Sequence, residues 1–527
     1  MRQGEKKGTI HMIAKCYSGA IHGVAATPVE IEVNSHRTQE TNRFAIVGLP
    51  DTAVREAKDR VMTAVMNSRF RPNSTLSVTV NLAPADVRKE GPMYDLPIAL
   101  SFLRTLGFIK NEGLCDFGMV GELALSGEVR KTKATIPIVM AMKALGKKKM
   151  LVPIENAKEA SIVDGIDVIP IHSLCEAVAY LNGDIDITPT KTDLARLISG
   201  ASTYSDDFAD VKGQESVKRA VEVAVAGGHN ILMIGSPGSG KTMIARRVPS
   251  ILPPMSVAEA LEVSKIHSVA GISKTTNPFL ISRPFRAPHH TVSSVGLLGG
   301  GPHATPGEVS LAHRGVLFLD EFAEFPRTAL EVLRQPLEDG HVNISRAAAA
   351  YQYPSRFMLI AAMNPCPCGY YNDPTHECRC SQLQILRYQQ RISGPLLDRI
   401  DIQTGVSAVP PRELDGLGRG EPSAAIRARV LQAREIQRRR YREMPGISTN
   451  AEAKSRDLVD ICRLSAAGRE EVRRTIDALK LSARAYDRIL RVARTIADLA
   501  GRESVEQSDI FEAASYRRLD HENGFWL

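Results

Sequence analysis

The stretch HNILMIGSPGSGKTMIARRV, residues 229–248, decides the fold of this 527-residue chain. An apolar run that ends at Ile234 leads into the pattern G-x-x-x-x-G-K-T, and a helical pattern follows. A strand, a glycine-rich loop and a helix in this order form a phosphate-binding loop, because the N–H groups of the loop and the helix N-terminus face a bound anion. In such a loop the lysine reaches the β- and γ-phosphates and the hydroxyl ligates Mg²⁺. We therefore expect the nucleotide to be bound by Gly235, Ser236, Pro237, Gly238, Ser239, Gly240, Lys241 and Thr242.

Two further apolar runs end in polar side chains. GVLFLDEF, residues 315–322, delivers Asp320 and Glu321, and RFMLIAAMN, residues 356–364, delivers Asn364. Open α/β sheets bind ligands at the carboxyl ends of their strands, so we expect these side chains beside the phosphate loop. There Asp320 would hold Mg²⁺ through water, and Glu321 would polarise the water that attacks the γ-phosphate. The cofactors predicted are therefore ATP and Mg²⁺.

This order of motifs resembles the AAA+ ATPases, which act as rings. The resemblance implies that Asn364 is the sensor-1 residue, which positions the attacking water. It also implies an arginine finger that stabilises the γ-phosphate charge of the neighbouring subunit. SGPLLDRIDI, residues 393–402, offers Arg399 for this role, Arg391 competes with it, and either could be a surface arginine paired with a nearby aspartate. In a C-terminal helical stretch, Arg484 resembles the sensor-2 arginine, which reaches the γ-phosphate.

Two inserts resemble those of magnesium chelatase ATPase subunits and MCM helicases. RPFRAPHHTVSSVGLLGGG, residues 283–301, looks like a hairpin inserted into a core helix. HVNISRAAAAYQYPS, residues 341–355, looks like a pre-sensor-1 hairpin. Such hairpins project into the ring pore, where the tips of Arg286, His289 and His290 would suit contact with a threaded strand. A histidine pair that only stabilises its loop is the alternative.

The first 185 residues narrow the resemblance to one family. VNLAPADVRKEGPMYDLPIALSFLRTLG at 80–107, MVGELALSGEVR at 119–130 and NPCPCGYY at 364–371 are similar to the ComM/YifB family of magnesium-chelatase-like AAA+ proteins. The similarity covers nearly the whole chain. It implies an α/β fold with a Lon-like (ribosomal S5 domain 2-like) N-domain, an AAA+ P-loop NTPase core and a C-terminal helical lid. The expected boundaries are 1–188 for the N-domain, 189–207 for a linker, 208–410 for the core and 411–527 for the lid.

The likeness to Lon peptidases raises proteolysis as an alternative function. Those peptidases use a Ser-Lys dyad, with the serine directly after Gly-Pro. Here Met93 follows Gly91-Pro92, and Ile136 occupies the position aligned with the lysine. Without the serine there is no group to acylate. We therefore expect a protease-inactive domain that binds or assembles.

The composition is that of ordinary globular protein, with 43% hydrophobic and 24% charged residues. No run approaches the ~18 apolar residues that a membrane span needs. The basic start has no sustained apolar core, so we expect an unprocessed, cytoplasmic chain with no membrane partner. The net charge of +8 permits a polyanionic partner such as nucleic acid.

Four of the chain's eight cysteines crowd into one short stretch: Cys366, Cys368, Cys378 and Cys380. The spacing offers four thiolates to a tetrahedral zinc ion, although C-x₂-C is more usual than the C-x-C found here. His376 could replace one sulfur. Unmetallated thiols and redox chemistry stay open as alternatives, whereas disulfides are disfavoured in a reducing cytosol.

A predicted helix, IRARVLQAREIQRRRYRE at 426–443, holds seven arginines. These could follow DNA phosphates, which would make binding salt-sensitive. They could equally form a solvated face or a ring interface, and the position after the arginine finger favours the interface.

The resemblance to the ComM/YifB family implies a homohexameric ATPase that moves along DNA, as a helicase or branch-migration motor in recombination or natural transformation. We expect single-stranded or branched DNA to be bound without sequence preference, because no base-reading module is evident. Arg346 in the second insert is expected to couple hydrolysis to movement. A chelatase-type motor that remodels a protein partner is the alternative, and a Lon-like protein unfoldase is a third.

Overall fold

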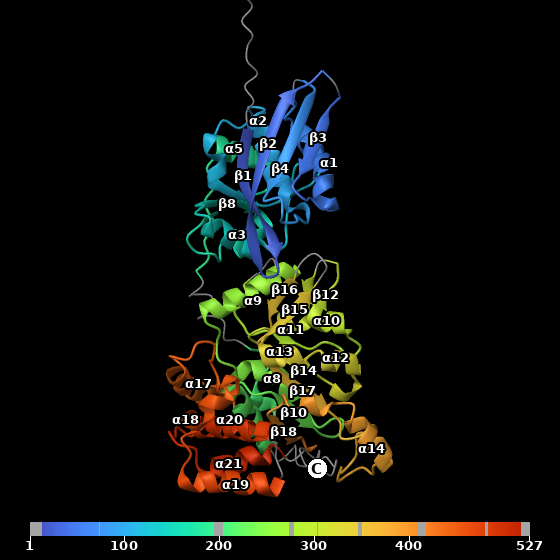
Figure 1. The fold of residues 1–527 in the computed structure, drawn as a ribbon, viewed down its shortest axis with the longest axis vertical. Helices are drawn as coiled ribbons and strands as arrows, with labels where there is room; N and C mark the ends of the chain where they lie inside the picture. Colours follow the sequence, from blue (N-terminus) through green and yellow to red (C-terminus); the bar gives the residue numbers. More distant parts are fainter. Residues whose placement is uncertain are drawn as a thin grey trace, which may run out of the picture. The chain divides into compact units, whose positions relative to one another are not determined.

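A computed structural model describes residues 13–39, 41–72, 74–193, 204–272, 279–302, 304–345, 350–408, 418–479 and 483–517. The chain forms two compact units (Figure 1). Unit 1 comprises Met1–Gly200 and Val257–Leu280, and unit 2 comprises Ala201–Ser256 and Ile281–Leu527. Most of the expected linker and Arg346 lie outside the described residues.

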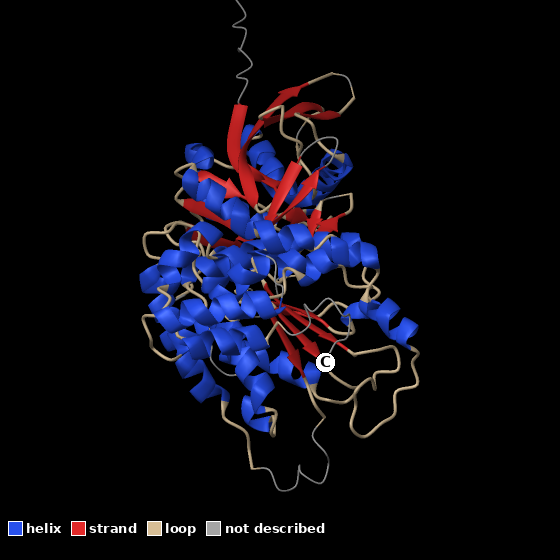
Figure 2. Ribbon diagram, turned by 60° about the horizontal axis from the view of Figure 1, so that its bottom comes forward, coloured by secondary structure: helices blue, strands red, loops and turns tan. Residues whose placement is uncertain are grey.

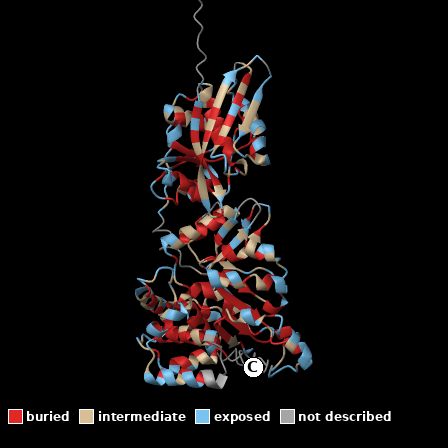
Figure 3. Ribbon diagram, in the orientation of Figure 1, coloured by how far each residue is buried: buried red, intermediate tan, exposed pale blue. Residues whose placement is uncertain are grey.

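Unit 1 is built on a seven-stranded mixed sheet in the order β3-β4-β2-β1-β5-β8-β9. In β4, alternate residues are buried because successive side chains point to opposite faces of a strand. Figure 3 shows the buried positions along these strands. The strands are β1 (Ile13–His22), β2 (Ala25–Arg37), β3 (Arg43–Val47), β4 (Leu76–Ala83), β5 (Phe117–Met119), β8 (Lys149–Pro153) and β9 (Asp167–Ile171).

The helices of unit 1 include one that comes from far along the chain. Helix α9 (Val257–Ala270) packs against α3 (Thr135–Ala144), and the N–H of Ala134 donates to the carbonyl of Ser268 over 2.9 Å. Residues 257–280, which the sequence places within the ATPase core, therefore cluster with unit 1. The other helices are α1 (Thr52–Asn67), α2 (Asp95–Thr105), α4 (Ile154–Ala160) and α5 (Leu174–Asn182).

Unit 2 has a five-stranded sheet in the order β11-β14-β17-β10-β18, and every neighbouring pair is parallel. Helices cover the sheet, and Figure 2 shows the strands in red among them. Such a sheet is buried on both faces. Ile231 and Met233 accordingly join one apolar cluster, and Leu232 and Ile234 join another. The strands are β10 (Ile231–Ile234), β11 (Phe285–Arg286), β14 (Val316–Leu319), β17 (Met358–Met363) and β18 (Ile402–Gly405).

The region beyond residue 411 is helical where the structure describes it, as the sequence predicts. Its helices pack on one another, and some also contact the helices on either side of the phosphate loop, α7 (Glu215–Gly227) and α8 (Lys241–Ile251). They are α17 (Ser423–Arg440), α18 (Leu458–Cys462), α19 (Ala466–Leu479), α20 (Ala483–Leu499) and α21 (Gln507–Ser515). Among all described residues, none of the helices is long and apolar enough to cross a membrane.

The two inserts differ in how well the sequence predicts them. Strands β15 (His341–Ser345) and β16 (Ala350–Pro354) pair antiparallel, so the second hairpin is confirmed. The first prediction is wrong for most of its length, because β11 joins the central sheet and α10 (Ser294–Leu298) follows. Only β12 (Gly299–Gly300) enters a two-stranded ladder, with β13 (Thr305–Pro306).

Candidate active site

The strand order of unit 2 brings three predicted segments to one edge of the sheet. β17 lies between β10 and β14, and all three strands are parallel. Ile234 lies opposite Met363, so the phosphate loop and Asn364 leave the sheet side by side. Asp320 leaves the next strand, β14, at the same edge. This topology is what places Asn364 between the phosphate loop and Asp320.

Lys241 is held inside the phosphate loop. Its Nζ donates to the carbonyl oxygens of Gly235 (2.7 Å) and Ser236 (2.9 Å), and it lies 3.3 Å from Oδ1 of Asn364. Burial lowers the pKa of Lys241 to about 8, and the nearby Asp320 opposes that shift. The oxygens around the Lys241 ammonium belong to neutral groups. The charged oxygens of an anionic ligand would replace them as its partners.

The loop depends on its glycines for its shape. Gly238 and Gly240 have φ of 77° and 91°, in the left-handed region that glycine adopts without strain. A Cβ on Gly235 would lie 2.2 Å from the carbonyl oxygen of Val406. Side chains at these three positions would therefore strain the loop or displace its neighbour.

Thr242 and Asp320 form the candidate magnesium site. The Oγ1 of Thr242 donates to Oδ2 of Asp320 over 2.6 Å. A hydroxyl and a carboxylate are hard oxygen ligands of the kind that Mg²⁺ prefers, with the remaining positions left to phosphates and water. The residues present therefore fit the ion, which Thr242 and Asp320 would hold.

Glu321 is held by a residue that the sequence assigned elsewhere. Its Oε2 lies 2.8 Å from Nδ1 of His290, and its own φ is 52°. A non-glycine residue in the left-handed region is strained, and such strain gathers at functional sites. His290 stacks against His289, with ring centroids 4.1 Å apart. The sequence suggested that the side chain of His290 would contact a strand threaded through a ring pore. The structure places this side chain against Glu321, the candidate base, and nothing in the local sequence pattern indicates that contact.

Each candidate arginine finger pairs with a carboxylate of its own chain. Arg399 pairs with Glu338, not with the neighbouring aspartates. Arg391 donates to Oε2 of Glu324 over 2.6 Å. Both partners precede the arginines by more than sixty positions, so no local pattern could reveal them.

Arg484 lies beside Asp398. Nη1 of Arg484 is 3.9 Å from Oδ2 of Asp398, the residue directly before Arg399, and its side chain is 69% exposed. Arg488, one helical turn on, is 3.4 Å from the same aspartate. The sensor-2 candidate thus contacts the residue that precedes the finger candidate in the chain.

The four cysteines of the 366–380 stretch come together. Their sulfur atoms all lie within 4.8 Å of one another, and the cysteines are Cys366, Cys368, Cys378 and Cys380. None forms a disulfide. His376 stacks on Tyr370 instead, with ring centroids 4.7 Å apart, and is not part of this group.

Several arginines of α17 are used within unit 2. Arg429 pairs with Glu222 and Glu421, and Arg440 donates to Asp498 over 2.8 Å. These contacts tie α17 to α7 and α20. Other members of the run, including Arg438 and Arg439, stay exposed beside Glu435. The helix therefore divides into arginines that hold the fold and arginines that face solvent.

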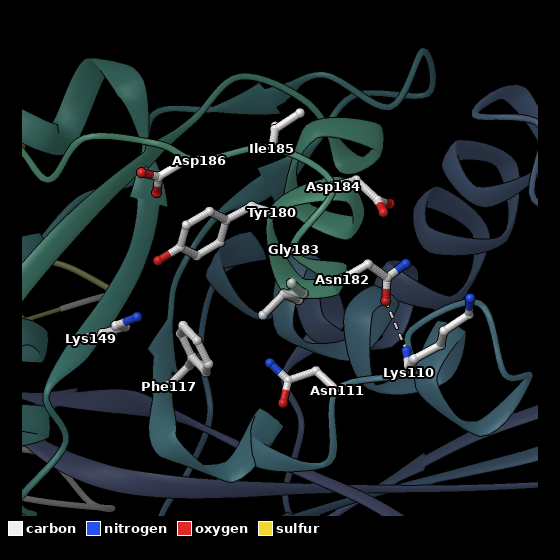
Figure 4. A pocket seen from close by; sticks show the side chains of 11 residues that line it. Lys110, Asn111, Phe117, Lys149, Tyr180, Asn182, Gly183, Asp184, Ile185 and Asp186 are labelled. Atoms are coloured by element: carbon white, nitrogen blue, oxygen red, sulfur yellow. Dashed lines mark hydrogen bonds between the residues drawn. The ribbon is translucent and has the colours of Figure 1, made fainter.

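Unit 1 contains an open pocket (Figure 4). The rings of Phe117 and Tyr180 meet edge to face there, with centroids 6.4 Å apart, and Nζ of Lys149 lies 5.8 Å from the Phe117 centroid. Its lining residues include no serine or cysteine and none of the predicted site residues. Met93 and Ile136, which the sequence resemblance aligns with the dyad of Lon peptidases, are buried apolar side chains.

Comparison with known proteins gives three family matches. They are "Magnesium chelatase, subunit ChlI" at 207–414, "Subunit ChlI of Mg-chelatase" at 31–156 and "Magnesium chelatase, subunit ChlI C-terminal" at 420–517.

Individual relatives match over very different lengths. The competence protein ComM of Haemophilus influenzae is 42% identical over 512 residues, which cover 96% of this chain and 98% of ComM. YifB of Escherichia coli is 40% identical over 506 residues, covering 96% of this chain and 97% of YifB. The magnesium-chelatase subunit ChlI of Euglena gracilis is 24% identical over 184 residues, covering 30% of this chain and 52% of that subunit.

Proposed function

The chain belongs to the ComM/YifB family of magnesium-chelatase-like proteins, and we propose that it is an ATP-hydrolysing AAA+ ring motor that acts on DNA. The observation that carries the ATPase part is the common edge at which Lys241, the Thr242–Asp320 pair and Asn364 meet. This edge of one parallel sheet carries the groups that would bind phosphate, ligate Mg²⁺ and orient an attacking water.

In the proposed mechanism the residues of this edge divide the work. Lys241 and the N–H groups of the loop bind the β- and γ-phosphates, and Thr242 and Asp320 hold the metal. Bound Mg²⁺ would neutralise the charge that develops on the phosphate oxygens. Asn364 orients the attacking water, and Glu321 accepts a proton from it as the water oxygen bonds to the γ-phosphorus; the bond from that phosphorus to the bridging oxygen breaks, and ADP leaves with this oxygen. We include a structural zinc ion on the four cysteines among the cofactors.

The ring part of the proposal concerns the arginines. We assign Arg399, with Arg391 as its competitor, to the γ-phosphate of a neighbouring subunit in a homohexamer. The position of Arg484 beside Asp398 supports placing it in the same interface. Unit 1 would be the protease-inactive, Lon-like assembly domain, and the C-terminal helices would be the lid.

The DNA part rests on three supports. A relative from Haemophilus influenzae is named a competence protein, and we propose a cytoplasmic setting for this chain. The net charge of +8 suits a polyanion, and the β15–β16 hairpin is the element we assign to the pore. The output would be branch migration or strand separation on single-stranded or branched DNA without sequence preference.

The test is ATP turnover of the purified full chain with single-stranded, forked and four-way DNA, followed by strand displacement on the same substrates. We expect each DNA form to raise turnover, with stimulation falling as salt rises, and Lys241→Ala to give none. An assembled ring that ignores all DNA forms but responds to a protein partner would instead support a chelatase-type motor. The ChlI subunit of Euglena gracilis matches only 30% of this chain, whereas ComM matches 96%, which makes that second function less favoured.

A further inference from the structure

The sulfur atoms of the cysteine cluster already have the spacing of a metal site. Cys366 lies 3.4 Å from Cys368 and 3.8 Å from Cys378, and Cys368 lies 3.6 Å from Cys378. Four thiolates bound at about 2.3 Å to a tetrahedral zinc lie about 3.8 Å apart. A disulfide would need about 2.05 Å. The arrangement therefore fits zinc with little rearrangement and does not fit a covalent pair.

The backbone around the cluster also suits thiolates. Cys366 accepts hydrogen bonds from the N–H groups of Tyr371 and Gly369. Cys368 accepts two more from the backbone. Donors of this kind orient metal ligands and stabilise negative charge on them. The loop thus brings its sulfur atoms together and directs backbone N–H groups at two of them.

This loop lies directly on the phosphate loop. The side chain of Ser236 hydrogen-bonds to the carboxylate of Asp373, which also accepts the N–H of Thr375 over 2.8 Å. Gly369 sits so close that an added Cβ would lie 2.6 Å from the ring of Pro237. Ser236 and Pro237 form the tip of the phosphate loop, and so the cysteine loop is one wall of the nucleotide site.

The same loop begins at Asn364, which lies beside Lys241. Its first residue, Pro365, accepts a hydrogen bond from Nε2 of Gln389 over 3.2 Å. The loop therefore starts beside Lys241 and contacts the phosphate loop again through Gly369 and Asp373. Any loosening of residues 365–380 would reach the phosphate loop through Asp373 and Gly369.

We propose that the four cysteines bind one zinc ion, and that this zinc-held loop clasps the phosphate loop so that metal occupancy sets the affinity for nucleotide. The inference rests on the nucleotide site proposed above. Without the metal, the loop gains conformational freedom that nucleotide binding must then remove, and this cost lowers the affinity.

The experiment measures zinc by elemental analysis and affinity with a fluorescent ATP analogue, both on the full chain, so it does not depend on turnover or on DNA. We expect one zinc per chain. The double variant Cys378→Ser/Cys380→Ser should lose the zinc and bind nucleotide about tenfold or more weakly, as losing more than one contact to the phosphate loop implies. Cys115→Ser, at an exposed thiol in unit 1, is the matched control and should change neither reading.

A second variant separates clasping from folding. Asp373→Ala keeps all four sulfurs but removes the contact with Ser236, so it should retain zinc and still bind nucleotide about three- to tenfold more weakly. Wild-type protein that binds nucleotide but holds no zinc would overturn the metal site. Zinc-free and Asp373→Ala proteins with wild-type affinity would overturn the clasp. Zinc-loaded wild type that binds no nucleotide would instead contradict the proposed function.

Discussion

Lys241 gives nucleotide binding its pH dependence. Its pKa in the free protein is lowered to about 8 by burial, against the pull of Asp320. Bound phosphates would raise that pKa, because nearby negative charge favours the protonated amine. A group whose pKa rises on binding supports affinity below its free pKa and loses that support as the pH rises. We expect affinity to be level up to about pH 8 and then to fall by up to about tenfold per pH unit.

Titration of a fluorescent nucleotide from about pH 7 to 9.5 checks this dependence on a single side chain. Lys241→Arg, whose cation stays protonated throughout, is the control and should give a level profile. A wild-type profile that is level across the whole range would contradict the shifted lysine.

Glu321 is the residue on which turnover should depend most. Glu321→Gln keeps the size and position of the side chain but cannot accept a proton, so ATP should still bind while turnover falls by about 100-fold or more. Nucleotide titration and steady-state phosphate release measure the two effects. Turnover at the wild-type rate would remove Glu321 from its proposed role.

His290 is expected to restrain that carboxylate when no substrate is present. The pair is 2.8 Å long, and Glu321 is 56% exposed, so the carboxylate must change partners before it can contact water at the γ-phosphate. His290→Ala should therefore raise turnover without DNA by about two- to fivefold, as the loss of one partly exposed hydrogen bond implies, and shrink the stimulation by DNA. His289→Ala leaves the pair in place and is the control; lower basal turnover in His290→Ala would mean that the histidine positions the base productively.

At the scale of elements, helix α17 stabilises the fold of unit 2. Arg440 donates to Asp498, whose side chain is fully buried, whereas the side chain of Arg438 is 79% exposed. Arg440→Ala leaves a buried carboxylate short of a partner and should cost about 1–3 kcal/mol of unfolding free energy. Arg438→Ala should stay within about 0.5 kcal/mol. Urea unfolding followed by circular dichroism compares the two, and equal losses would contradict this division of the arginines.

At the scale of the whole molecule, the proposed arginine finger would act between subunits. Arg399→Ala chains should bind ATP and turn it over slowly, because they cannot stabilise the charge of a neighbour's γ-phosphate. Mixed with Glu321→Gln chains, they should regain part of the activity at interfaces that combine an intact Arg399 with an intact Glu321. Tagged chains establish co-assembly, and co-assembled mixtures without any regain would argue against a shared site.

Much of unit 2 can be predicted because its motifs are consecutive residues. Glycines at 238 and 240 and an apolar β10 specify a phosphate loop within twenty positions. The β15–β16 hairpin is equally local. Helix α9 could not be predicted in unit 1, because its packing against α3 depends on a contact far along the chain. The prediction of a hairpin in the first insert is wrong for the same reason, since β11 pairs with its partner, β14, only in the folded sheet.

The phosphate loop, the acidic pair Asp320–Glu321 and the cysteine pattern can each be recognised in short runs of residues, because short-range order along a chain sets such local chemistry. Which of these groups meet depends on how the chain folds. In the folded chain, β17 lies between β10 and β14, and His290 contacts Glu321. The cysteine loop contacts Ser236 and Pro237. Contacts of this kind join residues that are distant in the chain, and strand order and packing bring them together, so no local pattern encodes them.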